Sequence, residues 1–286
     1  MQISEKLQAK QLTTSFEVFP PKNDAAYAPV EATIDALAQY KPDFISVTYG
    51  AGGGTSLNTP KIAAHIQSDL QIPSLAHLTC ASSTKAEIDA ILRDLKARGI
   101  ENILALRGDL PENYAPDSNH YRYASELITA IREFGGFSVG AACYPEGHVE
   151  SPSPDADLTH MKEKVDCGAD FLITQMFFDN TALYSFLYRA LKKGIDVPVL
   201  AGIMPVMNKR QIARSCALSG TTLPSRLKTM IDKFGDSPEA LKQAGIAYAT
   251  EQIIDLIANG VSGIHIYTMN RPEVAGAIMQ NLSSIL

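Results

Sequence analysis

The chain has 286 residues, of which 45% are hydrophobic and 20% are charged, and its formal net charge is −6. This composition is that of a globular protein with enough chain for a large core, and it fits one α/β barrel or two smaller domains. The negative charge argues against nucleic acid and anionic membranes as partners, and no apolar stretch is long enough to span a bilayer.

Neither the N-terminus nor the cysteines point to an exported protein. The chain begins MQISEKLQAKQLTT, which lacks the apolar core of a signal peptide. Its four cysteines, Cys80, Cys143, Cys167 and Cys216, are scattered and form no C-x-x-C pair. We therefore expect a reduced, cytoplasmic protein with buried thiols.

Short apolar runs, each followed by a helical pattern, recur along the chain and predict about eight buried strands. Most of them lack clean polar alternation, which is typical of strands covered on both faces in a parallel sheet. The predicted strands are 15–20 (SFEVFP), 44–50 (FISVTYG), 74–80 (SLAHLTC), 102–109 (NILALRGD), 138–146 (SVGAACYPE), 171–179 (FLITQMFFD), 198–206 (PVLAGIMPV) and 263–270 (GIHIYTMN).

Helical signals fill the gaps between these strands. Thr59 and Pro60 resemble an N-cap followed by proline at the first helical position. Thr84-Lys85-Ala86-Glu87 is a capping box ahead of an apolar stripe. Between the seventh and eighth strands, residues 207–262 are expected to hold two or three helices, the last at 238–259. Further apolar stripes at helical spacing lie at 127–134, 158–165 and 183–191.

The repeated alternation of strand and helix predicts a parallel sheet, and the chain length suits a (β/α)8 TIM-type barrel. The expected helices at 207–262 would be additions between strands 7 and 8. Because no linker or low-complexity stretch interrupts the pattern, we expect a single catalytic barrel domain over residues 1–286. A doubly wound open sheet is the alternative fold.

Polar residues follow the predicted strands at the face where barrels carry their active sites. Because separate chain segments deliver these residues, they indicate a shared ligand cavity, which Arg107 and Asp109 at the end of NILALRGD would face. The set is Glu17, Thr48, Tyr49, His77, Thr79, Arg107, Asp109, Tyr144, Gln175, Tyr267, Asn270 and Arg271.

The same residues argue against several kinds of chemistry. His77 and Cys80 have poor spacing for a shared metal, and no second cluster completes a ligand set, so we predict no metal. There is no G-x-S-x-G elbow of a serine hydrolase. The glycine-rich run 50–54 does not match G-x-G-x-x-G, and we interpret it as a loop where backbone approaches a ligand. A ligand cavity without a metal or a strong nucleophile favours chemistry supplied by an organic cofactor.

At these residues the sequence resembles the methylenetetrahydrofolate reductases of the bacterial, single-domain type. The resemblance covers nearly the whole chain and implies a (β/α)8 barrel, in agreement with the element pattern. It also implies a flavoprotein oxidoreductase of folate and one-carbon metabolism, serving methionine biosynthesis. The matching segments are FEVFPPK, SVTYGAGG, AHLTC, ALRGDLP, YPEGH, KVDCGADFLITQMFFD, GIMPV and YTMNR.

The resemblance implies a non-covalent FAD that takes a hydride from NADH or NADPH and passes it to 5,10-methylenetetrahydrofolate, giving 5-methyltetrahydrofolate in ping-pong fashion. Arg107 and Lys164 suit an anionic pyrophosphate. Since relatives associate, we also expect a homo-oligomer. By motif match, FAD would be bound by Thr48, His77, Arg107, Gly108, Asp109, Tyr123, Ala124, Tyr144, His148, Asp157 and Lys164.

The resemblance also assigns the catalytic and substrate residues. Glu17 is implied to be the general acid that protonates the folate nitrogen, which requires that a desolvated setting raise its pKa. Asp109 is implied to lie near the flavin and pterin and to tune hydride transfer without donating the proton. Substrate contacts are implied for Gln175, Gln211 and Arg271, besides Glu17.

The sequence departs from the family pattern at a few positions. Ser215 stands where relatives often carry an aromatic residue, and Asn58, His160 and Glu163 differ from the residues of some relatives. These departures concern affinity and the choice between NADH and NADPH. Two other functions stay open: a pterin-binding one-carbon transferase that needs no flavin, and a non-catalytic barrel that binds flavin or folate.

Overall fold

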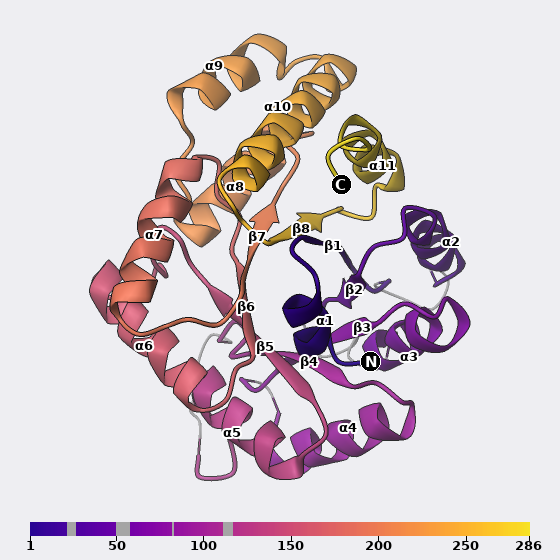
Figure 1. The fold of residues 1–286 in the computed structure, drawn as a ribbon, viewed down its shortest axis with the longest axis vertical. Coiled ribbons are helices and arrows are strands. Elements are labelled where there is room, and N and C mark those ends of the chain that lie inside the picture. The colour runs from indigo at the N-terminus through magenta and orange to yellow at the C-terminus, as the bar shows by residue number, and fades with distance from the viewer. Residues whose placement is uncertain (22–26, 50–57, 82, 111–116) are drawn as a thin grey trace.

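The computed structural model describes residues 1–21, 27–49, 58–81, 83–110 and 117–286. Within these ranges eight parallel strands close a barrel in chain order, and helices surround it (Figure 1). This confirms the predicted (β/α)8 barrel and rules out the open sheet. The strands are β1 Thr13–Val18, β2 Phe44–Val47, β3 Ser74–Thr79, β4 Asn102–Leu106, β5 Ser138–Cys143, β6 Phe171–Thr174, β7 Val199–Ile203 and β8 Gly263–Tyr267.

Three helices lie between β7 and β8, as the sequence predicted. The last of them, α10, spans Pro238–Ala258 and so agrees with the predicted 238–259. The other helices are α1 Ile3–Ala9, α2 Tyr27–Ala38, α3 Asn58–Ala64 with the π-helix η2 His65–Asp69, α4 Lys85–Ala97, α5 Ala124–Phe134, α6 Pro154–Asp166, α7 Asn180–Lys192, α8 Lys209–Ser219, α9 Ser225–Phe234 and α11 Pro272–Asn281.

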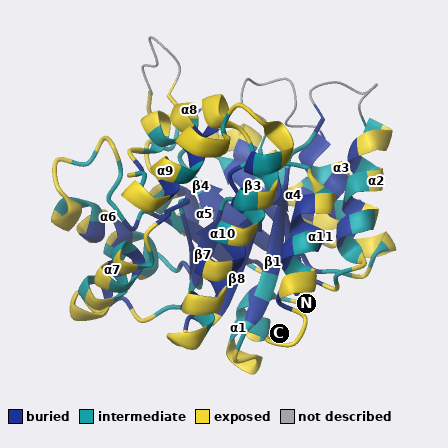
Figure 2. Cartoon of the chain, turned by 90° about the horizontal axis from the view of Figure 1, so that it is seen from above, coloured by how far each residue is buried: buried dark blue, intermediate teal, exposed yellow. Residues whose placement is uncertain are grey.

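Side chains on the strands alternate between the surrounding helices and the barrel interior. Outward residues such as Phe16 and Val18 pack in the large hydrophobic cluster shared with the helices. Inward residues such as Phe44 and Phe171 form a separate cluster inside the barrel. Figure 2 shows the strands as the buried centre of the molecule. The part of the interior that this cluster occupies is therefore packed with apolar side chains.

The N-terminal helix α1 was not predicted. It crosses the barrel end away from α8 (Figures 1 and 2). Ile3 is fully buried in the interior cluster, and its backbone N–H donates to Asn102 Oδ1 at 2.7 Å. The amphipathic stretch ISEKLQA thus closes one end of the barrel.

Some predicted boundaries were wrong. Helix α3 begins at Asn58, so Thr59 is not its N-cap. The Thr59 hydroxyl donates instead to the Thr48 carbonyl at 2.9 Å and ties the helix to the end of β2.

Strands β5 and β6 end at Cys143 and Thr174, earlier than predicted, because the residues that follow form loops at the barrel mouth. The capping box at Thr84 is confirmed. The glycine-rich run 50–54 lies outside the described residues.

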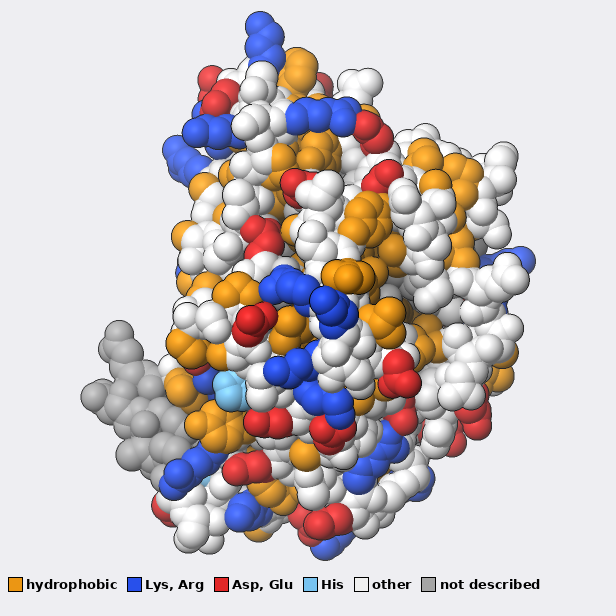
Figure 3. All heavy atoms as spheres, turned by 60° about the vertical axis from the view of Figure 1, so that its left-hand side comes forward, with side chains coloured by type: hydrophobic (Ala, Val, Ile, Leu, Met, Phe, Trp, Pro, Cys, Tyr) orange, Lys and Arg blue, Asp and Glu red, His pale blue; other side chains and the backbone are white. Residues whose placement is uncertain are grey.

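The surface carries mixed charge. On the face in Figure 3, acidic and basic side chains are interspersed among apolar ones. Along the described part of the chain, no helix has both the length and the apolarity needed to cross a membrane. The prediction that nucleic acid is not a partner stays a prediction.

Candidate active site

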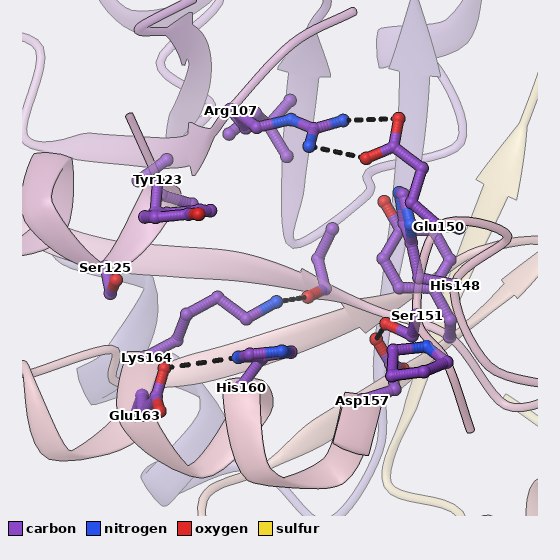
Figure 4. Close-up of a pocket in the computed structure, with 16 residues that line it drawn as sticks. Arg107, Tyr123, Ser125, His148, Glu150, Ser151, Asp157, His160, Glu163 and Lys164 are labelled. Carbon is purple, nitrogen blue, oxygen red and sulfur yellow. Dashed lines mark hydrogen bonds and ion pairs between the residues drawn. The ribbon is translucent and has the colours of Figure 1, made fainter. Parts of the chain in front are cut away.

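Two adjoining hollows lie at the carboxyl ends of the strands. The first, here called the groove, has a volume of about 510 Å³ and lies beside β4, β5, α5 and α6 (Figure 4). The second, the central cavity, has a volume of about 390 Å³ and lies over the barrel. Leu106, Ala142 and Tyr144 line both hollows, so the two spaces adjoin.

Most residues predicted to bind FAD line these hollows. Thr48 and His77 line the central cavity, and Tyr144 lines both spaces. Gly108 and Asp109 line neither. Those that line the groove are Arg107, Tyr123, Ala124, Tyr144, His148, Asp157 and Lys164.

The turn Arg107-Gly108-Asp109 is fixed by its backbone. Gly108 has φ +85°, and a Cβ there would lie 3.0 Å from the Thr79 Cβ, so only glycine fits without strain. The Arg107 carbonyl accepts the N–H groups of Cys80 at 3.2 Å and Ala81 at 2.8 Å. These contacts hold the Arg107 side chain in the groove, whereas Asp109 is exposed.

Arg107 has a carboxylate partner that the sequence did not reveal. Its Nη1 and Nη2 lie 2.6 Å and 3.0 Å from the two carboxylate oxygens of Glu150 (Figure 4). This hydrogen bonding holds the pKa of Glu150 below its ordinary value. The Glu150 N–H donates to His148 Nδ1 at 3.1 Å, which leaves Nε2 as the donor of a neutral His148.

Lys164 places a second cation in the groove. Its ammonium donates to the Ala142 carbonyl, and burial lowers its pKa. Among the described residues, no carboxylate lies within ion-pair distance of Lys164. The neighbouring Tyr144 stays neutral because burial raises its pKa to about 12. An incompletely neutralised, partly buried cation is a suitable partner for an anionic ligand.

Glu17 lies buried at the base of the central cavity, among side chains from three other strands. Its Oε2 is 3.4 Å from His77 Nε2, 3.5 Å from His265 Nε2 and 3.4 Å from Ser46 Oγ. The strand register brings them together, since Glu17 is level with Ser46 of β2 and Ser15 is level with His265 of β8. Sequence analysis identified Glu17 and His77 here but missed Ser46 and His265.

The predicted rise in the pKa of Glu17 was wrong. Burial by itself raises the pKa of Glu17, but the hydrogen bonds with His265 and Ser46 and the electrostatic interaction with the two neighbouring imidazoles outweigh it, so the pKa lies below its ordinary value. Burial also lowers the pKa of His77 to about 4. The apolar neighbours Phe16 and Phe19 suggested desolvation alone, because sequence does not show which polar groups face a residue across a barrel.

The predicted substrate residues are not all brought together. Gln175 lines the central cavity, and its Oε1 accepts the Met176 N–H at 2.8 Å, which leaves the amide NH2 available as a donor. Gln211 lines a small hollow next to it. Arg271 is exposed, 3.8 Å from Glu273, and lines neither space. Ser215 lines the wall of the central cavity.

The loop after β8 holds the end of β1. Thr268 Oγ1 donates to the Glu17 carbonyl at 2.6 Å. The Asn270 amide accepts the Phe19 N–H and donates to the Phe19 carbonyl, both at 2.9 Å. Met269 and Asn270 have φ of +53° and +54°, and such left-handed backbone at a site costs energy that the surrounding contacts must offset.

Within the described ranges, no three His, Cys, Asp or Glu side chains are grouped as metal ligands. The prediction that the chemistry needs no metal therefore stays a prediction.

Comparisons with known proteins identify a family that this chain resembles along nearly its whole length. The family model "Methylenetetrahydrofolate reductase" matches residues 2–283. The chain is 38% identical to the 5,10-methylenetetrahydrofolate reductase of Escherichia coli over 272 residues, covering 95% of this chain and 91% of the relative. It is 34% identical to methylenetetrahydrofolate reductase (NADH) 1 of Arabidopsis thaliana over 289 residues, covering 96% of this chain and 49% of the relative.

A solved structure supports the fold. An uncharacterized Clostridium thermocellum protein that binds two copies of 5-methyl-5,6,7,8-tetrahydrofolic acid has a TM-score of 0.67 at 15% identity, covering 99% of this chain and 98% of that one.

Proposed function

The chain belongs to the methylenetetrahydrofolate reductase family and is an oxidoreductase of folate one-carbon metabolism, and we propose that it reduces 5,10-methylenetetrahydrofolate with a hydride from NAD(P)H by way of non-covalent FAD, in a ping-pong reaction. The observation that carries this proposal is that a groove with two cations adjoins a cavity with a buried carboxylate. NADH is the proposed donor, because plant relatives are named for it.

The residues present fit FAD. Arg107 and Lys164 would pair with its pyrophosphate, and Tyr123 and Ala124 would border the remainder of the nucleotide. His77 Nε2 is buried and has no hydrogen-bond partner among the described residues, so a polar group of a ligand would satisfy it. When bound, FAD supplies the chemistry of taking up a hydride from one substrate and giving it to the other.

The protein's own residues would orient the folate and supply a proton. Glu17 would protonate the folate nitrogen as the methylene bridge opens to an electrophilic iminium, which then accepts the hydride. The Gln175 amide would bind the pterin or the nicotinamide amide, and Asp109 would tune hydride transfer from the rim. Gln211 and Arg271 remain proposed contacts for the outer parts of the substrate.

Three further expectations belong to this proposal. We propose that residues 1–286 act as one catalytic domain, that the protein assembles as a homo-oligomer, and that it works in the cytoplasm. Free cysteines at all four positions agree with a reducing compartment.

Purification tests the proposed reaction. We expect a yellow protein that loses its colour with NADH under anaerobic conditions and regains it with methylenetetrahydrofolate. A colourless protein that binds no added FAD would favour the one-carbon transferase. A yellow protein inert to NADH and NADPH would favour a non-catalytic binding barrel.

A further inference from the structure

A histidine lies beneath Glu17 that the proposed reaction has not used. His265, on β8, is 0% exposed and stacks on Phe44 with ring centroids 5.9 Å apart. It does not line the central cavity, so a ligand there does not reach it directly. Burying an imidazole is costly unless its nitrogens find partners, so its contacts indicate what it does.

The contacts of His265 fix which nitrogen faces Glu17. Nδ1 lies 2.8 Å from Ser15 Oγ, and this hydroxyl also donates to the Ile264 carbonyl at 3.3 Å. Because a hydroxyl has one hydrogen, donation to Ile264 leaves its lone pair to accept Nδ1–H. Nε2 lies 3.5 Å from Glu17 Oε2 and 3.5 Å from Ser46 Oγ, so it is the ring nitrogen that faces the carboxylate.

We propose that His265 is a positioning residue that shares one proton with Glu17 and keeps it available for transfer to the folate nitrogen. This inference rests on the proposed function. Before transfer, the pair holds one proton besides the hydrogen on Nδ1. As the proton moves, the O–H bond of Glu17 breaks and an N–H bond forms on the folate. A carboxylate and a neutral imidazole remain, and solvent returns one proton per turnover.

The other groups that face Glu17 do not supply this proton near pH 7. His77, from β3, is neutral there because burial lowers its pKa to about 4. Tyr267, from β8, keeps its hydrogen because burial raises its pKa far above the ordinary value, and it donates to the Thr174 carbonyl at 2.5 Å. Ser46, from β2, does not titrate. A shared proton also explains how Glu17 can act as an acid although its own pKa is lowered.

The test is the pH dependence of the two half-reactions in His265→Gln, whose amide forms hydrogen bonds but holds no proton. We expect the folate half-reaction at pH 7 to slow by ~10-fold or more, with its pH profile displaced, because general-acid catalysis contributes about 10²–10⁴-fold. Reduction of the flavin by NADH, which needs no such proton, should stay within about twofold.

Two serine variants complete the experiment. Ser15→Ala keeps the imidazole but removes its hydrogen-bond partner. We expect the pH profile of the folate half-reaction to be displaced in the same direction as in His265→Gln, but by less. It decides the question if His265→Gln does not fold. Ser138→Ala is the matched control: it is also fully buried in a strand, but its hydroxyl accepts the Ser4 N–H at 3.2 Å, at the end closed by α1. Both half-reactions should be unchanged there.

The outcomes separate this inference from the proposed function. Unchanged pH profiles in folded His265→Gln and Ser15→Ala, together with a crippled folate half-reaction in Glu17→Gln, would overturn the shared proton and leave the proposed proton donor intact. An unimpaired folate half-reaction in Glu17→Gln would overturn both.

Discussion

At the scale of single residues, Lys164 is the clearest link between structure and cofactor. Replacing it with methionine keeps the aliphatic stem and removes the charge. We expect the FAD dissociation constant to rise ~10–100-fold, since a hydrogen bond to a charged group contributes about 1.5–3 kcal/mol. Lys162→Met is the matched control, on the same helix but paired with Asp166. Equal FAD affinity in both variants, measured by flavin fluorescence, would remove Lys164 from the site.

His77 gives a prediction for stability against pH. Its pKa falls from 6.5 to about 4 on folding, so below pH 6.5 the unfolded chain binds a proton that the folded chain resists. Above pH 6.5 this difference in proton uptake does not lower the free energy of unfolding. As the pH falls from 6.5 toward 4, the free energy of unfolding falls by ~3 kcal/mol in total. The lowered pKa of Glu17 acts in the same direction. Urea denaturation from pH 7 to pH 4 should show a shallower loss in His77→Gln than in the natural chain.

His65 provides a control of opposite sign. Burial alone lowers its pKa, but hydrogen bonds with Asp69 and Asp35 outweigh burial and raise it. Its stabilising effect is therefore present in acid and lost as the pH rises through the folded value. His65→Gln should lose stability mainly at low pH. If the His77 and His65 variants showed parallel pH curves, the assigned causes would be wrong.

At the scale of elements, the loop after β8 and the end of β1 act as one unit. Asn270→Ala removes two hydrogen bonds to the Phe19 backbone and should cost ~1–3 kcal/mol of folding free energy. Because this strand end carries Glu17, we also expect slower folate reduction at unchanged FAD affinity. Asn270→Asp, which keeps the acceptor for the Phe19 N–H, should lose less folding free energy than Asn270→Ala. A folate half-reaction at full rate in Asn270→Ala would show that the contact serves stability alone.

Sequence periodicity predicted the eight strands and the helices between them, because each strand is covered on both faces and each helix has one apolar stripe. It did not predict which inward residues meet. Ser15 and Glu17 share one face of β1, as His265 and Tyr267 do of β8, and this period of two was a usable signal. That Glu17 and His265 touch follows from strand register, which a single strand sequence does not specify.

Other site features depended on distant segments as well. Arg107 was identified from its position after β4, but its partner Glu150 lies beyond β5 and follows no strand directly. Gln211 came from motif matching alone, whereas Arg271 was also identified from its position after the eighth predicted strand, and neither residue lines the central cavity. Motifs identify residue types in order along the chain, whereas distances across the mouth depend on loop paths.

At the scale of the whole molecule, the barrel end that α1 closes contributes to stability, and the open end carries the proposed chemistry. Ile3 of α1 fills the closed end, so Ile3→Ala should cost ~2–5 kcal/mol of folding free energy in urea denaturation. Both half-reactions should keep their rates in the folded variant. Ile285→Ala, at an exposed site, should cost no more than ~0.5 kcal/mol. A loss for Ile3→Ala no larger than that control would show that α1 is not part of the core.

The most direct test of the whole account is Glu17→Gln, followed by anaerobic stopped-flow measurement of each half-reaction. Only folate reduction needs the proton, so NADH should reduce the flavin at a rate within about twofold of the natural chain, while reoxidation by methylenetetrahydrofolate should slow by ~10²–10⁴-fold. If both rates fell together, or if reoxidation kept its full rate, Glu17 would not be the proton donor at this barrel mouth.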